Sequence, residues 1–345
     1  MLWMFNKQMT KFTYDIIGCG AVVEQFHVPI LLHLKREYNV HVRGCFDSNV
    51  QNAAKIGRLL KSSMVGPPDG IREISTVDAA LIATPPDSHS EYVRRYINER
   101  KPVLVEKPFV TSIEDARELV DLSQKQNTRI LVGNFRRFFP SVTLARRIVS
   151  SGVIGEITGV EASEGMRWEW PVSSNYVVES RFGGVIYDTG AHLLDMVLYI
   201  LSLDAQRLEW KINEIEKEPV REPSHVCRAT VTLNDARFNN LKMHLNLSRV
   251  DPVARIVKIY GTRGRVLVPT AFSHIPILEC ENGDSDFPRE MSGPVAMDET
   301  GCFLLEHQCM IEHLLKRSGK SVLDGENFVS LVGIMESLAA GNGAQ

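Results

Sequence analysis

The chain has 345 residues, of which 44% are hydrophobic and 23% charged, and its formal net charge is −3. This length predicts about two globular domains, and the small net charge gives no electrostatic basis for binding nucleic acid or an anionic membrane. No run reaches the roughly 18 apolar residues of a membrane span, and the N-terminus lacks the apolar core of a signal peptide. Six scattered cysteines without a Cys-x-x-Cys spacing predict reduced thiols and no metal site. We therefore expect a cytoplasmic protein.

The first 133 residues alternate between strand-like and helix-like segments. The run 77–84 is apolar almost throughout, as expected for a strand of a parallel sheet that is buried on both faces. The alternation predicts an α/β fold with a doubly wound parallel sheet, which is a Rossmann dinucleotide-binding domain over residues 1–133. The predicted strands are 12–17, 39–46, 77–84, 102–105 and 129–133, and the predicted helices lie at 26–32, 90–99 and 112–126.

A glycine-rich turn lies between the first strand and the first helix. Gly18 permits a tight turn, and Gly20 lets the backbone approach a pyrophosphate, whose charge the N-terminus of the helix attracts. Asp47 closes the second strand, where its carboxylate can accept hydrogen bonds from an adenosine ribose. A carboxylate there repels a 2′-phosphate, so NAD is the predicted cofactor and NADP the alternative. The predicted contacts of the turn are Gly18, Gly20, Ala21 and Val22.

Two features depart from the usual dinucleotide-binding pattern. Val23 occupies the third glycine position, where a small residue normally permits close packing of helix on strand. Asp47 lies further along the chain than the usual acidic residue, which a long first helix and its loop would explain. Taken alone, the segment is also compatible with a plain loop.

Polar residues gather where the predicted strands end, and doubly wound sheets bind their ligands at the carboxyl ends of the strands. Two prolines after Thr84 stop the third strand and favour an extended loop. Lys107 follows the fourth strand, and its alternative role is a surface salt bridge. The residues predicted to contact the cofactor here are Thr84, Pro85, His89, Glu106, Lys107 and Asn134.

From residue 134 the pattern changes, and we predict a second domain over residues 134–345. Alternating polar and apolar residues, as in 157–164, predict strands separated by turns. A polar segment at 281–294 is predicted to be an exposed loop. The predicted strands are 157–164, 208–215, 226–233, 241–247, 253–260 and 265–268, and the predicted helices are 140–150, 303–317 and 325–340.

The segment 182–200 combines a Gly-Gly turn, an apolar helix-like run and two polar residues spaced by four. Asp188 and His192 lie on one face if a helix begins here. A carboxylate beside an imidazole fixes the tautomer of the ring and raises its basicity, as a general base requires. The alternative is structural, with Asp188 or Thr189 capping the helix and His192 as a core residue.

Four motifs in this order resemble the Gfo/Idh/MocA family of NAD(P)-dependent sugar and inositol dehydrogenases. They are Glu106-Lys107-Pro108, the loop from Thr84 to His89, the stretch 134–138, and the glycine, aspartate and histidine pattern of 183–195. The resemblance covers nearly the whole chain. It implies an α+β second domain for substrate binding and oligomerisation, with an open, mostly antiparallel sheet. It also implies a homodimer or homotetramer, and a cis peptide bond before Pro108.

The resemblance implies that Lys107, Asp188 and His192 form a catalytic site for a secondary alcohol or ketone of a sugar, sugar derivative or inositol. His192 would remove the hydroxyl proton and Asp188 would orient its ring. Lys107 would stabilise the alkoxide or share the proton transfer. Two alternatives remain: an enzyme that uses NAD transiently to cleave a glycosidic bond without net redox change, and a non-catalytic NAD-binding sensor.

The segment 166–176 places two tryptophans, an arginine and a tyrosine just before the Gly-Gly turn. Aromatic faces with polar edges suit a carbohydrate-like ligand, so Arg167 and Tyr176 are predicted to contact substrate. A packing loop or an oligomer contact is the alternative for this segment.

Overall fold

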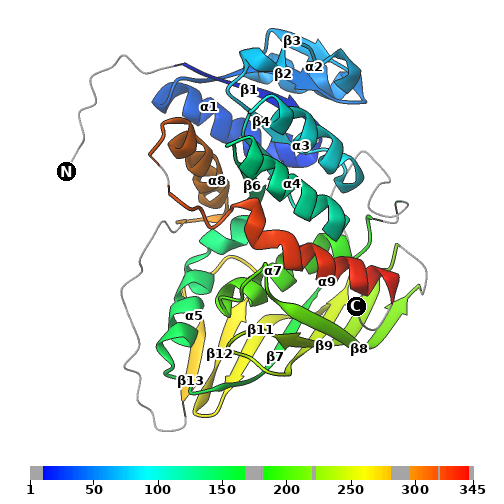
Figure 1. The fold of residues 1–345 in the computed structure, drawn as a ribbon, viewed down its shortest axis with the longest axis vertical. Coiled ribbons are helices and arrows are strands. Elements are labelled where there is room, and N and C mark those ends of the chain that lie inside the picture. The colour runs from blue at the N-terminus through cyan, green and yellow to red at the C-terminus, as the bar shows by residue number, and fades with distance from the viewer. Residues whose placement is uncertain are drawn as a thin grey trace, which may run out of the picture.

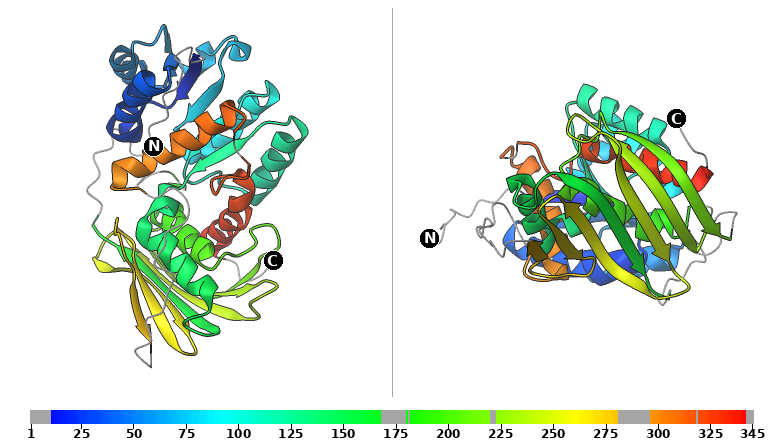
Figure 2. Two further views of the ribbon diagram at one scale, coloured as in Figure 1. Left: turned by 90° about the vertical axis from the view of Figure 1, so that its left-hand side faces the viewer. Right: turned by 90° about the horizontal axis from the view of Figure 1, so that it is seen from below.

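The computed structural model describes residues 11–167, 180, 182–219, 223–280, 296–317 and 319–341, and these residues form two β-sheets. One sheet belongs to the N-terminal part of the chain and the other to the C-terminal part, and they lie toward opposite ends of the molecule (Figure 1). Helices α7 (Ala191–Ile200) and α9 (Val329–Ala340) pack against each other in the layer between the sheets (Figure 2).

The N-terminal sheet has six parallel strands in the order β3-β2-β1-β4-β5-β6. Successive strands are added on one side of β1 as far as β3 and on its other side from β4 onward. Ligands bind such sheets at this switch point between β1 and β4. The predicted doubly wound sheet is therefore confirmed. Its strands are β1 (Phe12–Ile17), β2 (Val40–Phe46), β3 (Met64–Gly66), β4 (Ala79–Ile82), β5 (Val103–Glu106) and β6 (Ile130–Gly133).

Helices connect the strands of this sheet. A π-helical turn, η1 (Val23–His27), leads directly into the first helix, and this long segment accounts for the late position of Asp47, as predicted. In the fourth helix, Ala116, Leu119 and Val120 are buried, so the amphipathic pattern faces the core. The helices are α1 (Val28–Glu37), α2 (Val50–Leu60), α3 (His89–Asn98) and α4 (Ile113–Lys125).

In the N-terminal half, helix α2 and strand β3 form where the sequence analysis predicts neither a helix nor a strand. Asn49 caps α2, because its side-chain oxygen accepts a hydrogen bond from the N–H of Gln51 at 3.0 Å. Strand β3 has only three residues and extends the sheet beside β2. So short a strand gives no periodic signal in the sequence, and only its pairing with β2 defines it.

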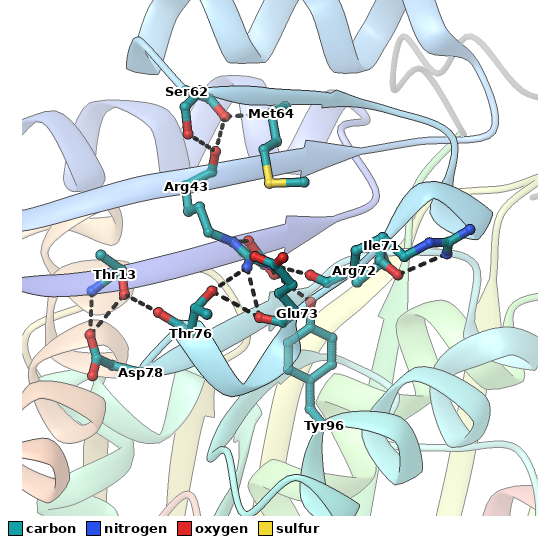
Figure 3. A network of polar contacts seen from close by, with 12 residues as sticks. Thr13, Arg43, Ser62, Met64, Ile71, Arg72, Glu73, Thr76, Asp78 and Tyr96 are labelled. Carbon is teal, nitrogen blue, oxygen red and sulfur yellow. Dashed lines mark hydrogen bonds and ion pairs between the residues drawn. The ribbon is translucent and has the colours of Figure 1, made fainter.

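A buried polar network ties β1, β2 and the loop before β4 together (Figure 3). Asp15 of β1 is fully buried and accepts hydrogen bonds from Arg43 at 2.5 and 3.0 Å and from the hydroxyl of Tyr96 at 2.8 Å. Arg43 also donates to the carbonyl of Glu73 at 2.8 Å. Burial, with the charge of Asp15, raises the pKa of Tyr96, so its hydroxyl stays protonated and donating. Each buried polar group in this network therefore has a partner that offsets its desolvation.

The C-terminal sheet has seven strands in the order β13-β12-β11-β7-β10-β9-β8. Only β7 and β10 pair in parallel, which confirms the open, mostly antiparallel sheet. In β10, buried Leu241, Met243 and Leu245 alternate with exposed Lys242 and His244, so one face packs on the helices. The strands are β7 (Ile157–Gly165), β8 (Glu209–Glu218), β9 (Val226–Asn234), β10 (Leu241–Ser248), β11 (Val253–Gly261), β12 (Gly264–Pro269) and β13 (Ile277–Cys280).

The last helices of the chain return to the N-terminal sheet. Helix α8 (Glu299–Leu314) packs against β5, β6 and η1, and α9 packs against both α4 and β8. Beside β6, the N–H of Val132 donates to the carbonyl of Leu323 at 2.8 Å. The N-terminal sheet ends with β6 at Gly133 and the C-terminal sheet begins with β7 at Ile157. The predicted domain boundary between 133 and 134 stays a prediction, as does the extent of the second domain. Helix α5 (Pro140–Ser151) follows the boundary.

All six cysteines lie within the described residues and are free, in agreement with the prediction of unpaired thiols. In the described part of the chain, no helix has both the length and the apolar character that crossing a membrane requires. The predicted loop at 281–294 lies outside the described residues.

Candidate active site

Side chains from both halves of the chain meet at the carboxyl end of β5. Lys107 directly follows this strand, and the Lys107–Pro108 peptide bond is cis, as the family resemblance implies. Asp188 lies in a π-helical turn, η6 (Ile186–Gly190), and His192 lies in the first turn of α7. Arg249 follows the end of β10. The fold therefore brings the predicted catalytic residues together and adds an arginine to them.

The contact between Lys107 and Asp188 is the centre of the site. Lys107 Nζ lies 2.6 Å from Oδ1 of Asp188 and 3.5 Å from its carbonyl oxygen. Oδ2 of Asp188 pairs with Arg249, which is buried and also donates to the carbonyl of Gly183 at 3.4 Å. The side chains of Lys107 and Asp188 are 18% and 29% exposed, so solvent and small molecules can reach the pair.

His192 lies beside this pair, but Asp188 does not orient its ring as expected. Both carboxylate oxygens of Asp188 contact cations, and Nδ1 of His192 is buried without a hydrogen-bond partner among the described residues. The edge of the Phe135 ring packs on His192, with centroids 5.2 Å apart. The reason for the difference is Arg249, because a charged guanidinium binds a carboxylate more strongly than a neutral imidazole does. A buried, unpartnered ring nitrogen is a candidate contact for a ligand.

The surroundings of Lys107 make its amine titrate near neutrality. Burial lowers the pKa of Lys107 to about 7; the charge of Glu106 opposes this decrease, and Arg249 and Arg136 add to it. The carboxylate of Asp188, in direct contact, also favours the protonated amine. An amine with such a pKa can both accept and donate a proton under physiological conditions.

His192 differs from Lys107 in its electrostatics. Burial, followed by the charges of Lys107 and Arg136, holds the pKa of His192 well below its usual range. The ring is therefore neutral at physiological pH. Burial lowers the pKa of Arg249 to about 9, and this residue remains charged near neutrality.

A second ion pair borders the site. Arg136 lies in the short 3₁₀ turn η5 (Phe135–Phe138) and donates two hydrogen bonds, of 2.6 and 2.9 Å, to the carboxylate of Glu164 near the end of β7. Both side chains are mostly buried. Glu164 and Arg249 were not singled out by the sequence analysis, because neither belongs to a motif, whereas Arg136 lies in the 134–138 stretch.

The glycine-rich turn fits a dinucleotide. Gly18 has a φ of +88°, and a Cβ atom there would lie 2.3 Å from the carbonyl oxygen of Ala83, so only glycine fits between β1 and β4. The Cβ position of Gly20 is open, which leaves the space that a pyrophosphate needs. Oδ2 of Asp47 accepts a hydrogen bond from the N–H of Cys19 at 2.6 Å. The acidic residue therefore lies at the turn itself, although Val23 replaces the third glycine.

The remaining residues predicted to contact the cofactor include Asn134 and Thr84, which follow neighbouring strands of the sheet. Asn134 follows β6 and is buried, and neither its Oδ1 nor its Nδ2 has a partner among the described residues, which fits a ligand that would satisfy them. The hydroxyl of Ser88 donates to the hydroxyl of Thr84 at 2.8 Å, in the loop that contains Pro85. Ala21 and Val22, both half-buried, continue from the glycine turn into η1.

His89 and Glu106 have partners within the protein. Nδ1 of His89 lies 2.9 Å from the carbonyl oxygen of Pro108, and Nε2 lies 2.8 Å from that of Thr84, so His89 clamps the loops after β4 and β5. Burial lowers the pKa of His89, while these carbonyls oppose the decrease. Oε2 of Glu106 accepts a hydrogen bond from the N–H of Lys107 at 3.1 Å. The cofactor contacts predicted for His89 and Glu106 stay predictions.

The substrate contacts predicted for Arg167 and Tyr176 stay predictions. Arg167 is exposed beyond the end of β7, and Tyr176 lies outside the described residues. Among the residues that the structure describes, no group of three or more histidine, cysteine, aspartate or glutamate side chains is arranged to hold a metal ion.

Comparison with known families covers both halves of the chain. The profile described as "Oxidoreductase family, NAD-binding Rossmann fold" matches residues 12–134, and that of the "GFO/IDH/MocA C-terminal domain" matches residues 142–267. The chain belongs to the Gfo/Idh/MocA family. The resemblance seen in the four motifs is thereby confirmed, as is the expected NAD-binding Rossmann domain.

Individual Gfo/Idh/MocA relatives are distant in sequence. An uncharacterized oxidoreductase of Streptococcus pneumoniae is 23% identical over 304 residues, which are 84% of this chain and 81% of the relative. Glucose-6-phosphate 3-dehydrogenase of Bacillus subtilis is 25% identical over 55% of this chain and 53% of the relative. The 2,7-anhydro-N-acetylneuraminate hydratase of Escherichia coli is 27% identical over 54% of this chain and 49% of the relative. The chain thus aligns with only about half the length of the latter two relatives.

Solved structures match the fold over nearly the whole chain. The 3-ketoreductase KijD10 of Actinomadura kijaniata, in complex with NADP and TDP-benzene, has a TM-score of 0.75 and 17% identity, and covers 96% of this chain and 98% of its own. The WlbA dehydrogenase of Bordetella pertussis, with NADH and UDP-GlcNAcA, has a TM-score of 0.75 and 15% identity, and covers 96% and 95%. At such identities these structures show the shared fold alone.

Proposed function

We propose that this Gfo/Idh/MocA protein is a dehydrogenase or reductase that transfers a hydride between a nicotinamide cofactor and a secondary alcohol or ketone of a sugar, sugar derivative or inositol. The contact between Lys107 Nζ and Asp188 at the carboxyl end of β5 carries this proposal. The lysine has a pKa of about 7, and the glycine turn that fits a dinucleotide lies at the same edge of the parallel sheet, where its strands have their carboxyl ends. Oxidation of an alcohol requires a group that accepts the hydroxyl proton and a cofactor that accepts the hydride.

In this proposal Lys107 exchanges the proton with the substrate oxygen. Its pKa near neutrality matches that role better than the low pKa of buried His192, which makes the imidazole a weak base. His192 would instead hydrogen-bond the substrate through a ring nitrogen. Asp188, held by Arg249, would keep the lysine amine in place. The assignment of His192 as the base stays the alternative within the same site.

The cofactor supplies or accepts the hydride when it is bound. The turn from Gly18 to Val22 would hold its pyrophosphate, and Asp47 would bind the adenosine ribose. Asn134, with its unpartnered amide, would contact the nicotinamide end. Asp47 favours NAD over NADP, because its carboxylate repels a 2′-phosphate.

The proposal also includes a cytoplasmic location, a small carbohydrate-like substrate as the partner, and a homodimer or homotetramer. The sugar-phosphate dehydrogenase among the relatives and the sugar nucleotide bound to WlbA support the substrate class. The near-neutral net charge of −3 supports the absence of nucleic acid as a partner.

The test is the absorbance of NADH at about 340 nm with purified protein, NAD or NADP, and a panel of sugars, inositols, sugar phosphates and nucleotide sugars. We expect net reduction of NAD with one class of substrate. Lys107→Met should lose at least about 100-fold in kcat while NAD still binds, because a general acid–base contributes about 10²–10⁴-fold. Equal turnover by the Lys107→Met variant would contradict the proposal.

A second candidate is a redox-neutral reaction in which the hydride returns to the substrate. The match to 2,7-anhydro-N-acetylneuraminate hydratase favours it, because the name of that relative describes no net redox change. In this case chromatography would show loss of the substrate while the absorbance of NADH stays constant. A non-catalytic sensor would bind NAD without converting any member of the panel.

A further inference from the structure

Helix α8 places two ionisable side chains in the interior, and the proposed proton transfer uses neither of them. Glu306 and His307 are both fully buried. The helix packs against η1, β6 and β5, the strand that Lys107 directly follows. Burying ionisable groups costs free energy unless they are paired or neutral, so their arrangement calls for an explanation.

A continuous row of hydrogen bonds leads from α8 to Lys107. Nε2 of His307 lies 2.9 Å from Nδ1 of His27, which closes η1. Nε2 of His27 lies 2.8 Å from Oε1 of Glu106. Oε2 of Glu106 accepts the hydrogen bond from the N–H of Lys107 at 3.1 Å. Both histidines are fully buried and Glu106 is 7% exposed, so water competes little with these contacts.

The hydrogen-bond partners in this row determine which nitrogen atoms of the two histidines carry a proton. An ionised Glu106 accepts hydrogen bonds at both of its oxygens, and with this charge state His27 would donate through Nε2. Nδ1 of His27 then carries no proton and accepts from Nε2–H of His307. Burial, followed by His27, holds the pKa of His307 well below its usual range, which keeps this ring neutral. Nδ1 of His307 is left as an acceptor without a partner among the described residues, and the centroids of the His307 and Tyr14 rings are 6.2 Å apart.

Glu306 is a second buried carboxyl group near Glu106. A Cβ atom on Gly133 would lie 3.5 Å from Oε1 of both Glu106 and Glu306, so both carboxyl groups border the end of β6. Neither oxygen of Glu306 has a partner among the described residues. Burial, followed by the charge of Glu106, raises the pKa of Glu306 well above its usual range. Glu306 is therefore protonated and neutral, and it adds no negative charge beside Glu106.

The charge of Glu106 acts on the lysine amine together with its other neighbours. It opposes the decrease that burial causes, as the carboxylate of Asp188 does in direct contact with the amine. The titratable and charged groups that face Lys107 are Glu106, Asp188, Arg249, Arg136, Glu164 and His192. The titratable groups that face Glu106 are His27, His89, Lys107 and Glu306.

The titratable groups beside the ring of His307 are His27 and Tyr14. The titratable groups near Glu306 include Cys302 and Cys309.

We propose that His27 is a positioning residue which, held in its donating tautomer by His307 of α8, keeps Glu106 ionised and thereby sets the proton affinity of the Lys107 amine. The catalytic consequence rests on the proposed function, in which Lys107 exchanges the proton. The ionisation of Lys107 can be measured without substrate or cofactor, so the two proposals can fail separately.

The experiment follows acetylation of Lys107 by acetic anhydride as a function of pH, with peptide-resolved mass spectrometry. Only the neutral amine reacts, so the midpoint of the labelling curve reports its ionisation. Exposed Lys211 of β8 is the internal reference. The matched variants are His27→Leu, which removes the donor to Glu106, and His27→Gln, whose amide can occupy the place of Nε2–H. Glu106→Gln removes the charge itself and gives the full size of the effect.

We expect His27→Leu and Glu106→Gln to move the midpoint of Lys107 to lower pH by about one unit. Glu106→Gln removes the negative charge directly, and His27→Leu removes the donor without which Glu106 takes up a proton. His27→Gln should keep the wild-type midpoint, and Lys211 should not change in any variant. A purely packing role would lower the melting temperature of both His27 variants without this difference in midpoint. An unchanged Lys107 midpoint in Glu106→Gln would overturn the proposal even if His27→Leu does not fold. Equal shifts in His27→Leu and His27→Gln would also overturn it.

Discussion

At the scale of single residues, the ionisation of Lys107 depends on charges that come from several parts of the chain. Burial and the nearby arginines favour the neutral amine, while Glu106 and the contact with Asp188 favour the protonated amine. The balance lies near neutrality, where a proton donor and acceptor works best. Arg249 contributes indirectly, because it holds the carboxylate that contacts the amine.

The pH dependence of turnover should therefore report the ionisation of Lys107. In alcohol oxidation the amine must be neutral to accept the hydroxyl proton, so kcat rises with pH through a midpoint of about 7. In carbonyl reduction the protonated amine is required, so kcat falls as pH rises through the same midpoint. Asp188→Asn should move both midpoints to lower pH, because the carboxylate favours the protonated amine.

The measurement is kcat at saturating substrate in both directions, with Lys125→Met at the exposed end of α4 as the matched control. This control should keep the wild-type profile. Profiles that rise with pH in both directions would contradict the assignment of the proton to Lys107.

At the scale of elements, the turn between β1 and η1 combines a structural and a ligand-binding glycine. A Cβ atom at position 18 would clash with the carbonyl oxygen of Ala83, and the φ of +88° would strain any residue other than glycine. Gly20 has neither constraint, so the protein alone does not require a glycine there. The reason for Gly20 is then the approach of a ligand to the backbone.

Substitution of these two glycines should separate stability from cofactor binding. Gly18→Ala should lower the free energy of unfolding by about 2 kcal/mol or more, through backbone strain and displacement of β4. Gly20→Ala should change it by less than about 0.5 kcal/mol, yet weaken NAD binding because its methyl group enters the space for the pyrophosphate. Urea denaturation and NADH fluorescence titration measure the two quantities. A Gly20→Ala protein with wild-type affinity for NAD would show that the pyrophosphate does not bind at this turn.

At the scale of the whole molecule, Arg137 joins the two parts of the fold. It lies in η5 and donates to both carboxylate oxygens of Asp195 in α7, at 2.5–3.1 Å, and to the carbonyl of Val322 at 2.5 Å. Its guanidinium lies 4.0 Å from the ring centroid of Phe328 in η7 (Gly325–Phe328). Burial raises the pKa of Asp195, and Arg137 opposes this increase. The pair thus links the connection after β6, α7 and the segment before α9.

Arg137→Met should lower the free energy of unfolding by about 3–5 kcal/mol, because it leaves the carboxylate of Asp195 buried without its cation. The double variant Arg137→Met/Asp195→Leu should recover most of that loss, since it removes the buried charge as well. Urea denaturation of the two single variants and the double variant gives the coupling. Additive losses would mean that Arg137 and Asp195 stabilise the fold independently of each other.

The sequence by itself determined the features that local patterns encode. The uninterrupted apolar run of β4, the alternation in β7 and the glycine at position 18 specify a buried strand, a half-exposed strand and a tight turn, and the structure has all three. Pattern alone missed β3, because three residues carry no period. The family motifs also placed Lys107, Asp188 and His192 in one site, and the fold brings them together.

Only the tertiary structure decided which side chains pair within that site. Asp188 contacts Lys107 and Arg249 instead of orienting His192, and Glu106 binds His27, which in turn contacts His307. These partners come from distant segments, so no spacing in the sequence relates them. Their contacts arise where separate elements pack together, and burial then decides which group keeps its proton and which keeps its charge.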